Sequence, residues 1–298
     1  MRKALFLVNP ISGRGRHGLA RARCIEAFNA GGLEVEVLEI PGPAEVARAV
    51  GEYGGADFEM LLAGGGDGTV REVAEVAAHL ELPLGVIPLG TSNTVARELG
   101  LPLDPVAASR VTASGRERVI DLGDAGGAKF ILCLGVGFDA DVIRRVHIGR
   151  ERGISMYTYA PATAGAYLGY GYPGIEVEVD GRAMPPGAFQ VVVANAGSYA
   201  GYFKVAGRAE IDDGWLDVCL LYGGKWSLLR QALRALRGRP LLARPETHRG
   251  PGAVCLRARE VFIPGPPSAP VQIDGDMATG LPRTIRVLPG ALRVIVPG

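Results

Sequence analysis

The segment from Met60 to Thr69 reads M-L-L-A-G-G-G-D-G-T, and the organisation of the chain follows from it. The apolar run 58–63 predicts a buried parallel strand, and apolar residues at helical spacing follow from Val70 to Ala77. Glycine permits positive φ and close approach of a phosphate to the backbone, and a helix start directs N–H groups at an anion. Three consecutive glycines would weaken an ordinary turn, so we interpret this turn as a phosphate-binding site.

Asp67 lies within the turn. Like charges repel, so its carboxylate would not contact a bare phosphate directly, whereas a metal ion between the two groups would account for its position. The chain contains no G-x-x-x-x-G-K-[ST] segment, which argues against a Walker-type nucleotide site.

The composition is that of a globular protein. Of 298 residues, 48% are hydrophobic and 21% charged, which suffices for a sizeable core. A net charge of +1 argues against nucleic-acid binding, and four widely spaced cysteines predict buried thiols in a reduced, cytoplasmic protein. No run of 18 apolar residues predicts a membrane span, and the four histidines show no metal-binding spacing.

Two domains are expected. Residues 1–122 alternate strands (4–8, 33–40, 58–63 and 84–88) with helices, which predicts a doubly wound, Rossmann-like parallel sheet that binds nucleotide. Residues 123–298 are rich in strands and predict a β-sandwich, with helical insertions near 140–170 and 226–236. A tight turn is expected at Pro289-Gly290, and the last strand, near 284–298, is an alternative member of the first domain.

Glycine-bearing turns follow the first, third and fourth strands, at the sheet edge where open α/β folds bind ligands. The segment 13–18 also fits G-x-G-x-x-G, the outline of a dinucleotide fingerprint. Residues 9–12 separate its first glycine from the strand, so we favour phosphate binding without a dinucleotide.

Six segments of the sequence resemble the motifs of one protein family. They are Asn9-Pro10-x-Ser12-Gly13-x-Gly15, Gly64–Thr69, Pro88-Leu89-Gly90-Thr91-x-Asn93, Gly135–Ala140, Ala209–Leu216 and Gln272–Asp276. In this order they resemble the diacylglycerol kinase catalytic-domain family, which includes sphingosine kinases and soluble bacterial lipid kinases. The resemblance covers nearly the whole chain. It implies an ATP- and Mg²⁺-dependent kinase of a lipid hydroxyl, with its site between a nucleotide-binding α/β domain and a β-sandwich lipid domain.

The resemblance also implies roles for single residues. Those expected at the nucleotide are Asn9, Ser12, Gly64, Gly65, Gly66, Asp67, Gly68, Thr69, Thr91 and Asn93. Asp274 would be the general base, and Asp67 and Asp276 would bind the metal ion. A separate structural Mg²⁺ would be held by the Asp213 side chain and the backbone carbonyls of Glu210 and Trp215. Two departures affect the metal region, since Thr94 replaces a common Asp and Asp276 replaces Glu.

The chemistry of these residues agrees with the resemblance. A lipid hydroxyl is a poor nucleophile and needs a base, while phosphoryl transfer otherwise needs positioning and charge neutralisation. Asp274 and Asp276 flank Gly275 and would point to the same side of a continuing strand. The alternative is a hairpin turn with solvated acids, which Asp-Gly favours.

Membrane contact is expected to be peripheral. Four arginines, Arg144, Arg145, Arg150 and Arg152, precede apolar residues between 156 and 168, which suits an anionic membrane surface and an acyl chain. For the basic amphipathic segment 228–239 we favour a packed helix with a solvated arginine face.

Two other functions stay open. NAD-kinase-like phosphorylation of a soluble substrate would share the Gly-Gly-Asp-Gly motif but not Asn-Pro-x-Ser-Gly, and a catalytically silent lipid- or nucleotide-binding regulator is the third hypothesis. The sequence specifies neither the lipid nor a homodimeric state.

Overall fold

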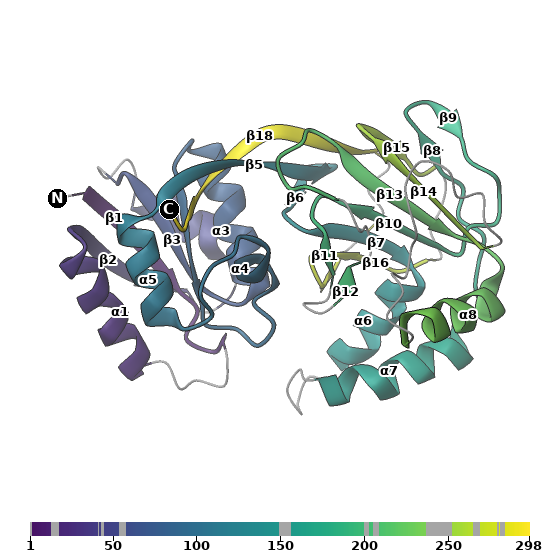
Figure 1. The fold of residues 1–298 in the computed structure, drawn as a ribbon, viewed down its shortest axis with the longest axis horizontal. Coiled ribbons are helices and arrows are strands. Elements are labelled where there is room, and N and C mark those ends of the chain that lie inside the picture. Colours follow the sequence, from purple (N-terminus) through teal and green to yellow (C-terminus); the bar gives the residue numbers. More distant parts are fainter. Residues whose placement is uncertain are drawn as a thin grey trace. The chain divides into compact units, whose positions relative to one another are not determined.

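The computed structural model describes residues 2–12, 18–40, 42, 45–53, 58–148, 156–199, 203–204, 209–236, 252–264, 269–278, 280 and 284–298. Within it the chain divides into two compact units. The first comprises residues 1–120 and 290–298, and the second comprises 121–289 (Figure 1). The sequence had suggested a boundary near residue 122.

The first unit is built on a parallel sheet in the order β2-β1-β3-β4. Its strands are β1 (Arg2–Val8), β2 (Leu33–Glu39), β3 (Met60–Gly65) and β4 (Leu84–Pro88). The three inner strands are mainly apolar and buried, as expected for strands covered on both faces, whereas the edge strand β2 alternates apolar and acidic residues. The helices are α1 (Gly18–Ala30), α2 (Val46–Glu52), α3 (Asp67–His79), α4 (Thr94–Glu98) and α5 (Pro105–Ser114). Helix α1 packs against α5, whereas α2 packs against α3. The predicted α/β class is confirmed.

The second unit contains a six-stranded antiparallel sheet in the order β14-β13-β10-β7-β16-β17. Its strands are β7 (Cys133–Gly137), β10 (Gln190–Ala194), β13 (Leu216–Leu221), β14 (Ala253–Ala258), β16 (Val271–Ile273) and β17 (Asp276–Met277). The opposing strands are β5 (Arg116–Ala125), β6 (Ala128–Phe130), β8 (Glu178–Val179), β9 (Arg182–Ala183), β15 (Glu260–Phe262) and β18 (Thr284–Val296), and a small hairpin pairs β11 (Ser198–Tyr199) with β12 (Phe203–Lys204).

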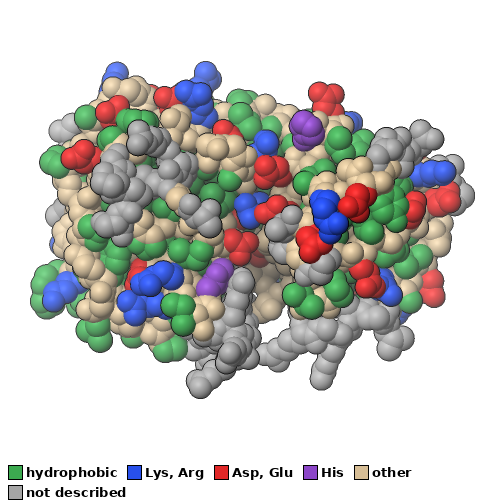
Figure 2. Space-filling model, turned by 180° about the vertical axis from the view of Figure 1, so that it is seen from behind, with side chains coloured by type: hydrophobic (Ala, Val, Ile, Leu, Met, Phe, Trp, Pro, Cys, Tyr) green, Lys and Arg blue, Asp and Glu red, His purple; other side chains and the backbone are tan. Residues whose placement is uncertain are grey.

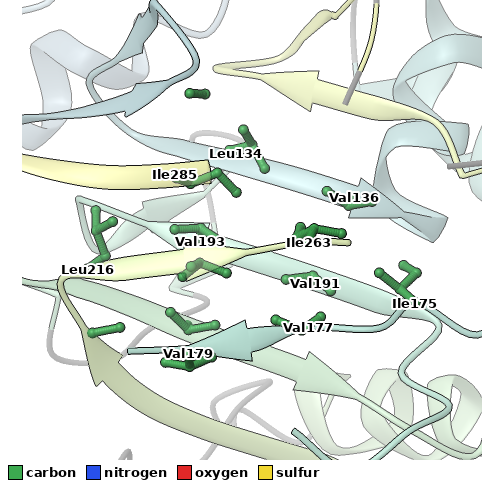
Figure 3. Packing of buried hydrophobic residues seen from close by; sticks show 14 of the residues in the cluster. Leu134, Val136, Ile175, Val177, Val179, Val191, Val193, Leu216, Ile263 and Ile285 are labelled. Atoms are coloured by element: carbon green, nitrogen blue, oxygen red, sulfur yellow. The ribbon is translucent and has the colours of Figure 1, made fainter. Parts of the chain in front are cut away.

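A hydrophobic core fills the space between these two layers (Figure 3). Alternate residues of the six-stranded sheet, such as Val136, Val191 and Val218, pack against Val179 and Ile285 of the opposing strands. The alternation of inward-facing residues on both layers is the pattern of a β-sandwich, so the predicted class of this domain is confirmed.

Three helices cover the other face of the six-stranded sheet, namely α6 (Phe138–Ile148), α7 (Met156–Gly169) and α8 (Gly224–Leu236). Phe138 and Ala166 pack there on Val192 and Cys219 of the sheet. The sequence had placed this helical layer as one long insertion near 140–170 and a second near 226–236.

The prediction of a tight turn at Pro289-Gly290 is wrong. β18 runs without reversal from Thr284 to Val296, pairs with β15 through its first residues and meets β4 at Val294. Gly290 has a φ of 63°. A proline and a positive-φ glycine can bend a strand where its partners change, without turning it back.

Candidate active site

The ends of β1, β3 and β4 lie together at one edge of the first unit's sheet. The Asn9 N–H donates to the Gly64 carbonyl at 2.9 Å, and the Leu89 N–H donates to the Gly65 carbonyl at 3.0 Å. The Asn9 side-chain amide also lies 3.4 Å from the Thr69 hydroxyl. The three glycine-bearing turns of the first domain are therefore neighbours, as their positions in the sequence indicated.

The glycines at this edge provide space and not an unusual conformation. Gly64, Gly65 and Gly66 are absent from the described residues with positive φ. A Cβ on Gly65 would lie 2.5 Å from the Thr69 side chain, and one on Gly90 would collide with the Gly66 Cα. Their role is to let turns pack closely, which corrects the expectation that they supply positive φ.

The start of α3 has the features of an anion site. Gly66 precedes the helix in an extended conformation, and no side chain caps the helix N-terminus. The first N–H groups of a helix have no partner within the helix, and the macrodipole there favours negative charge. A phosphate would satisfy both requirements.

Asp67 serves the neighbouring helix. Its Oδ1 accepts a hydrogen bond of 3.0 Å from the Val95 N–H, so this carboxylate caps α4. Asn93 closes the same loop, with a φ of 47°, by accepting from the Gly90 N–H at 2.9 Å and donating to the Gly90 carbonyl at 3.0 Å. Thr94, the first residue of α4, is buried, while Thr91 is exposed.

Asp274 lies in the second unit, in the turn between β16 and β17. Ile273 pairs with Asp276 across a two-residue turn in which Asp274 has a φ of 48° and Gly275 a φ of 88°. The hairpin alternative is thus the correct geometry, and the two acids do not share one continuing strand. Asp274 is nevertheless only 8% exposed, whereas that alternative predicted solvated acids.

Backbone N–H groups bind the Asp274 carboxylate. It accepts from Ile131 at 2.8 Å, from Leu132 at 2.9 Å and from Cys133 at 2.8 Å. A buried charge needs such partners, and these three fix the orientation of the carboxylate.

Polar side chains next to Asp274 brace the turn. Gln272 accepts from the Gly275 N–H at 2.8 Å and donates to the Asp139 carboxylate at 3.2 Å. Burial, followed by the negative charges of Asp274 and Asp139, raises the pKa of the Cys133 thiol well above its ordinary value. The thiol therefore stays protonated and is no nucleophile.

Hydrogen bonds and an ion pair within the protein stabilise the loop that was expected to bind a structural metal ion. The two carboxylate oxygens of Asp213 contact the Trp215 N–H, at 3.0 Å, and the Arg257 guanidinium. Asp121 accepts from the Gly214 N–H at 2.6 Å, while Glu210 is exposed. The described residues contain no cluster of three His, Cys, Asp or Glu side chains for a metal ion, but the expected site uses only one carboxylate and two backbone carbonyls.

The arginines expected at a membrane are partly neutralised. Arg144 and Arg145 both bind Asp141, with Nε to carboxylate distances of 3.1 and 2.7 Å. Burial alone would raise the pKa of Asp141, but hydrogen bonds and charges from both arginines outweigh it and lower the pKa. Arg150 and Arg152 lie outside the described residues, as do residues 13–17 of the first turn and 237–239 of the basic segment.

The apolar residues that follow these arginines mostly face inward. Ala166 is buried and Tyr159, Ala162 and Tyr167 pack against the cluster on the sheet, whereas Leu168 is 83% exposed. The side chains of Met156 and Tyr157 lie outside the described part of the structure.

Comparison with known proteins matches both units to family models. Residues 3–125 match the diacylglycerol kinase catalytic domain, and residues 133–296 match the YegS C-terminal NAD kinase beta sandwich-like domain. The chain is 31% identical to a diacylglycerol kinase of Mycobacterium tuberculosis strain H37Rv, over 99% of this chain and 95% of that protein. This chain belongs to the diacylglycerol kinase catalytic-domain family.

Other members are equally long. A diacylglycerol kinase of Bacillus subtilis is 26% identical over all of this chain and 97% of its own length. The crystal structure of a diacylglycerol kinase from Bacillus anthracis has a TM-score of 0.74 at 21% identity, covering 99% of this chain and 97% of that one, which supports the fold. The family implies use of ATP. None of the helices in the described residues is long and apolar enough to cross a membrane.

Asn195 and Arg257 make contacts that the sequence did not predict. Asn195 is fully buried and donates to the carbonyls of Asp121 and Ile131, at 3.0 and 2.9 Å. It therefore braces the segment whose N–H groups bind Asp274. Arg257, the ion-pair partner of Asp213, was missed because its 44-residue separation from Asp213 hides the contact that pairing of β13 with β14 creates.

Proposed function

We propose that this protein is an ATP- and Mg²⁺-dependent lipid kinase that transfers the γ-phosphoryl group of ATP to a lipid hydroxyl, with a diacylglycerol-like acceptor favoured. The observation that carries the proposal is the joined edge of β1, β3 and β4, where the uncapped start of α3 meets the glycine-bearing turns after β1 and β4. The family and its named relatives support the same activity.

The first unit would bind the nucleotide. The N–H groups at the start of α3 would hold its phosphates, with Asn9 and Ser12 beside them and Thr91 and Asn93 at the border of the site. ATP supplies the phosphoryl group, and Mg²⁺ would neutralise its charge. Asp67, in the N-terminal turn of α3, would bind the metal ion while it caps α4, and Asp276 would be a second carboxylate ligand.

The second unit would activate the acceptor. Asp274 would take the proton from the lipid hydroxyl as the new bond to phosphorus forms. Its three backbone hydrogen bonds suit this role because a base must be held in position before the reaction begins. A charged carboxylate in a buried turn needs hydrogen-bond donors, and this need also explains why three main-chain N–H groups donate to one side chain.

The apolar part of the lipid would lie against the helical layer of the second unit. Aromatic side chains gather there, with Tyr172 5.2 Å from both Tyr170 and Phe189, measured between ring centroids. The Tyr170 hydroxyl is buried without a hydrogen-bond partner in the described structure, and burial raises its pKa. A polar group of a ligand would satisfy this hydroxyl.

The test is phosphate transfer from labelled ATP to a panel of acceptors. The panel contains diacylglycerol, other lipids that carry a free hydroxyl, NAD and no acceptor. We expect a labelled phospholipid from at least one lipid acceptor and none from NAD. Labelled NADP would favour the soluble-substrate alternative, and ATP binding without any turnover would favour the silent regulator.

A further inference from the structure

Helix α8 sits on the second unit with one side inward and one side exposed. Ser227 is 4% exposed, and Leu228 packs against the apolar cluster under the helical layer. Trp226 and Leu229, one residue before and one after this pair, are 71% and 40% exposed. The helix is thus anchored by its inner side while two large apolar side chains remain outside.

The sequence in and around α8 carries charge of one sign. Lys225 and Arg230 are exposed, and the Lys225 ammonium lies 6.0 Å from the centre of the Trp226 ring. Between positions 218 and 245 the sequence has six basic residues and no acidic residue, although the whole chain has 32 basic and 31 acidic residues. Positive charge is therefore concentrated in the part of the sequence that contains Trp226 and Leu229.

This combination fits a bilayer surface. Tryptophan has an apolar ring and an N–H donor, and it concentrates at the boundary between lipid tails and water. Helices that lie in this boundary pair tryptophan and leucine with lysine and arginine, whose charges bind anionic lipid headgroups.

We propose that α8 docks the protein on anionic membranes, with Trp226 and Leu229 entering the interface and Lys225 and Arg230 binding headgroups. The proposal rests on the proposed function in one respect, since a lipid kinase must reach a bilayer to find its acceptor. Docking itself needs neither ATP nor turnover.

Tryptophan fluorescence provides the test. The full-length protein is titrated with phosphatidylcholine vesicles with or without phosphatidylglycerol, in the absence of nucleotide. The chain has two tryptophans, so the Trp226→Phe variant identifies the signal from α8. We expect a blue shift of Trp226 emission with anionic vesicles, quenching by brominated lipid, and loss of both effects at high salt.

Variants measure the contribution of each group. One basic residue near an anionic surface strengthens binding about fivefold, so Lys225→Gln with Arg230→Gln should weaken vesicle binding about 25-fold. Leu229→Ala should also weaken it. Leu80→Ala is the matched control, because Leu80 lies on the first unit with a similar exposure of 45%.

Several results would overturn the proposal. These are equal affinity for neutral and anionic vesicles, unchanged Trp226 emission on bound vesicles, or a dimer that Trp226→Ala converts to monomer without any vesicle binding. Vesicle binding without kinase activity would contradict the proposed function and leave docking intact. Turnover of detergent-dispersed lipid by a protein that binds no vesicles would contradict docking alone.

Discussion

Gly65 and Gly66 are adjacent in the turn before α3, but a methyl group would act differently at the two positions. A Cβ on Gly66 would find its nearest neighbour, the Gly90 Cα, at 3.5 Å, and the φ of Gly66 is an ordinary −89°. We therefore expect Gly66→Ala to fold with a near-normal melting temperature. Its ATP affinity should fall at least tenfold, because the methyl group blocks phosphate from the helix start.

Gly65→Ala is the matched control for this prediction. Its Cβ would meet the Thr69 side chain at 2.5 Å, and overpacking of this kind costs about 1–3 kcal/mol of stability. Calorimetric titration with ATP and thermal unfolding of both variants separate the two effects. Normal ATP affinity in a stable Gly66→Ala protein would show that the phosphates of ATP do not bind at this turn.

Asp213 gives a second prediction at the scale of single residues. Its carboxylate already binds Arg257, so a metal ion at this loop must compete with the arginine. Arg257→Ala should strengthen metal binding, and Mg²⁺ at ten times its Kd should then raise the free energy of unfolding by about 1.4 kcal/mol. Asp213→Ala should abolish the response to Mg²⁺. If neither Mg²⁺ nor EDTA changes the melting temperature of Arg257→Ala, that result would argue against a metal ion in this loop.

At the scale of elements, Asp67 links two helices and so has a structural and a proposed chemical role. Asp67→Asn keeps an oxygen for the Val95 N–H and should leave the melting temperature nearly unchanged, while the Mg²⁺ dependence of ATP binding is lost. Asp67→Ala also removes the cap of α4, which costs about 0.5–2 kcal/mol. If Asp67→Asn binds MgATP normally, the carboxylate is a cap alone.

Helix α6 predicts a pH effect. The pKa of Asp141 is lowered in the folded protein, so its pairing with Arg144 and Arg145 stabilises the fold above the ordinary value of 3.8 and is lost as the pH falls through the lowered pKa. Asp141→Asn should cost about 1 kcal/mol at pH 7, and its difference from wild type should shrink in acid. Denaturant unfolding across pH measures this.

Glu45→Gln is the control for Asp141, since Glu45 and its partner Arg48 on α2 are far more exposed. It should change the free energy of unfolding less than Asp141→Asn does. A constant cost of Asp141→Asn from pH 7 to pH 3 would contradict the predicted linkage.

The sequence predicted the elements well where hydrophobic runs and glycine turns mark them, as for β4 and the start of α3. It missed α5, although Asp104 caps this helix with a bond of 2.8 Å to the Ala107 N–H and Pro105 opens it. It also divided β18 at Pro289-Gly290, because local turn preference does not reveal that β15 and β4 bind the two halves of one strand.

The sequence likewise predicted one part of the candidate site and missed another. Local spacing was enough to bring the turns after β1, β3 and β4 to one edge, because parallel strands end on the same side. The donors to Asp274 come from a segment more than 140 residues earlier, and no local pattern encodes them. The same holds for Arg257 and Asn195, whose partners are set by strand pairing and burial.

At the scale of the whole molecule, basic and acidic residues are nearly equal in number, 32 against 31. Figure 2 shows acidic and basic side chains interspersed over the visible face, in keeping with a net charge of +1. Two local arrangements would therefore carry the proposed chemistry, the joined turns of the first unit and the braced Asp274 of the second. The proposed transfer of phosphate to a lipid would require both.

Turnover of Asp274→Asn tests this account most directly. Labelled phosphate transfer to the best lipid acceptor is measured at saturating ATP and lipid, alongside ATP affinity and the melting temperature. Removal of a positioned base costs roughly 10²–10⁴ in rate, so kcat should fall by that factor while ATP affinity changes little. The melting temperature should fall as well, because one amide oxygen cannot satisfy three N–H donors. Near-normal kcat in the folded variant would contradict the role of Asp274 as the base.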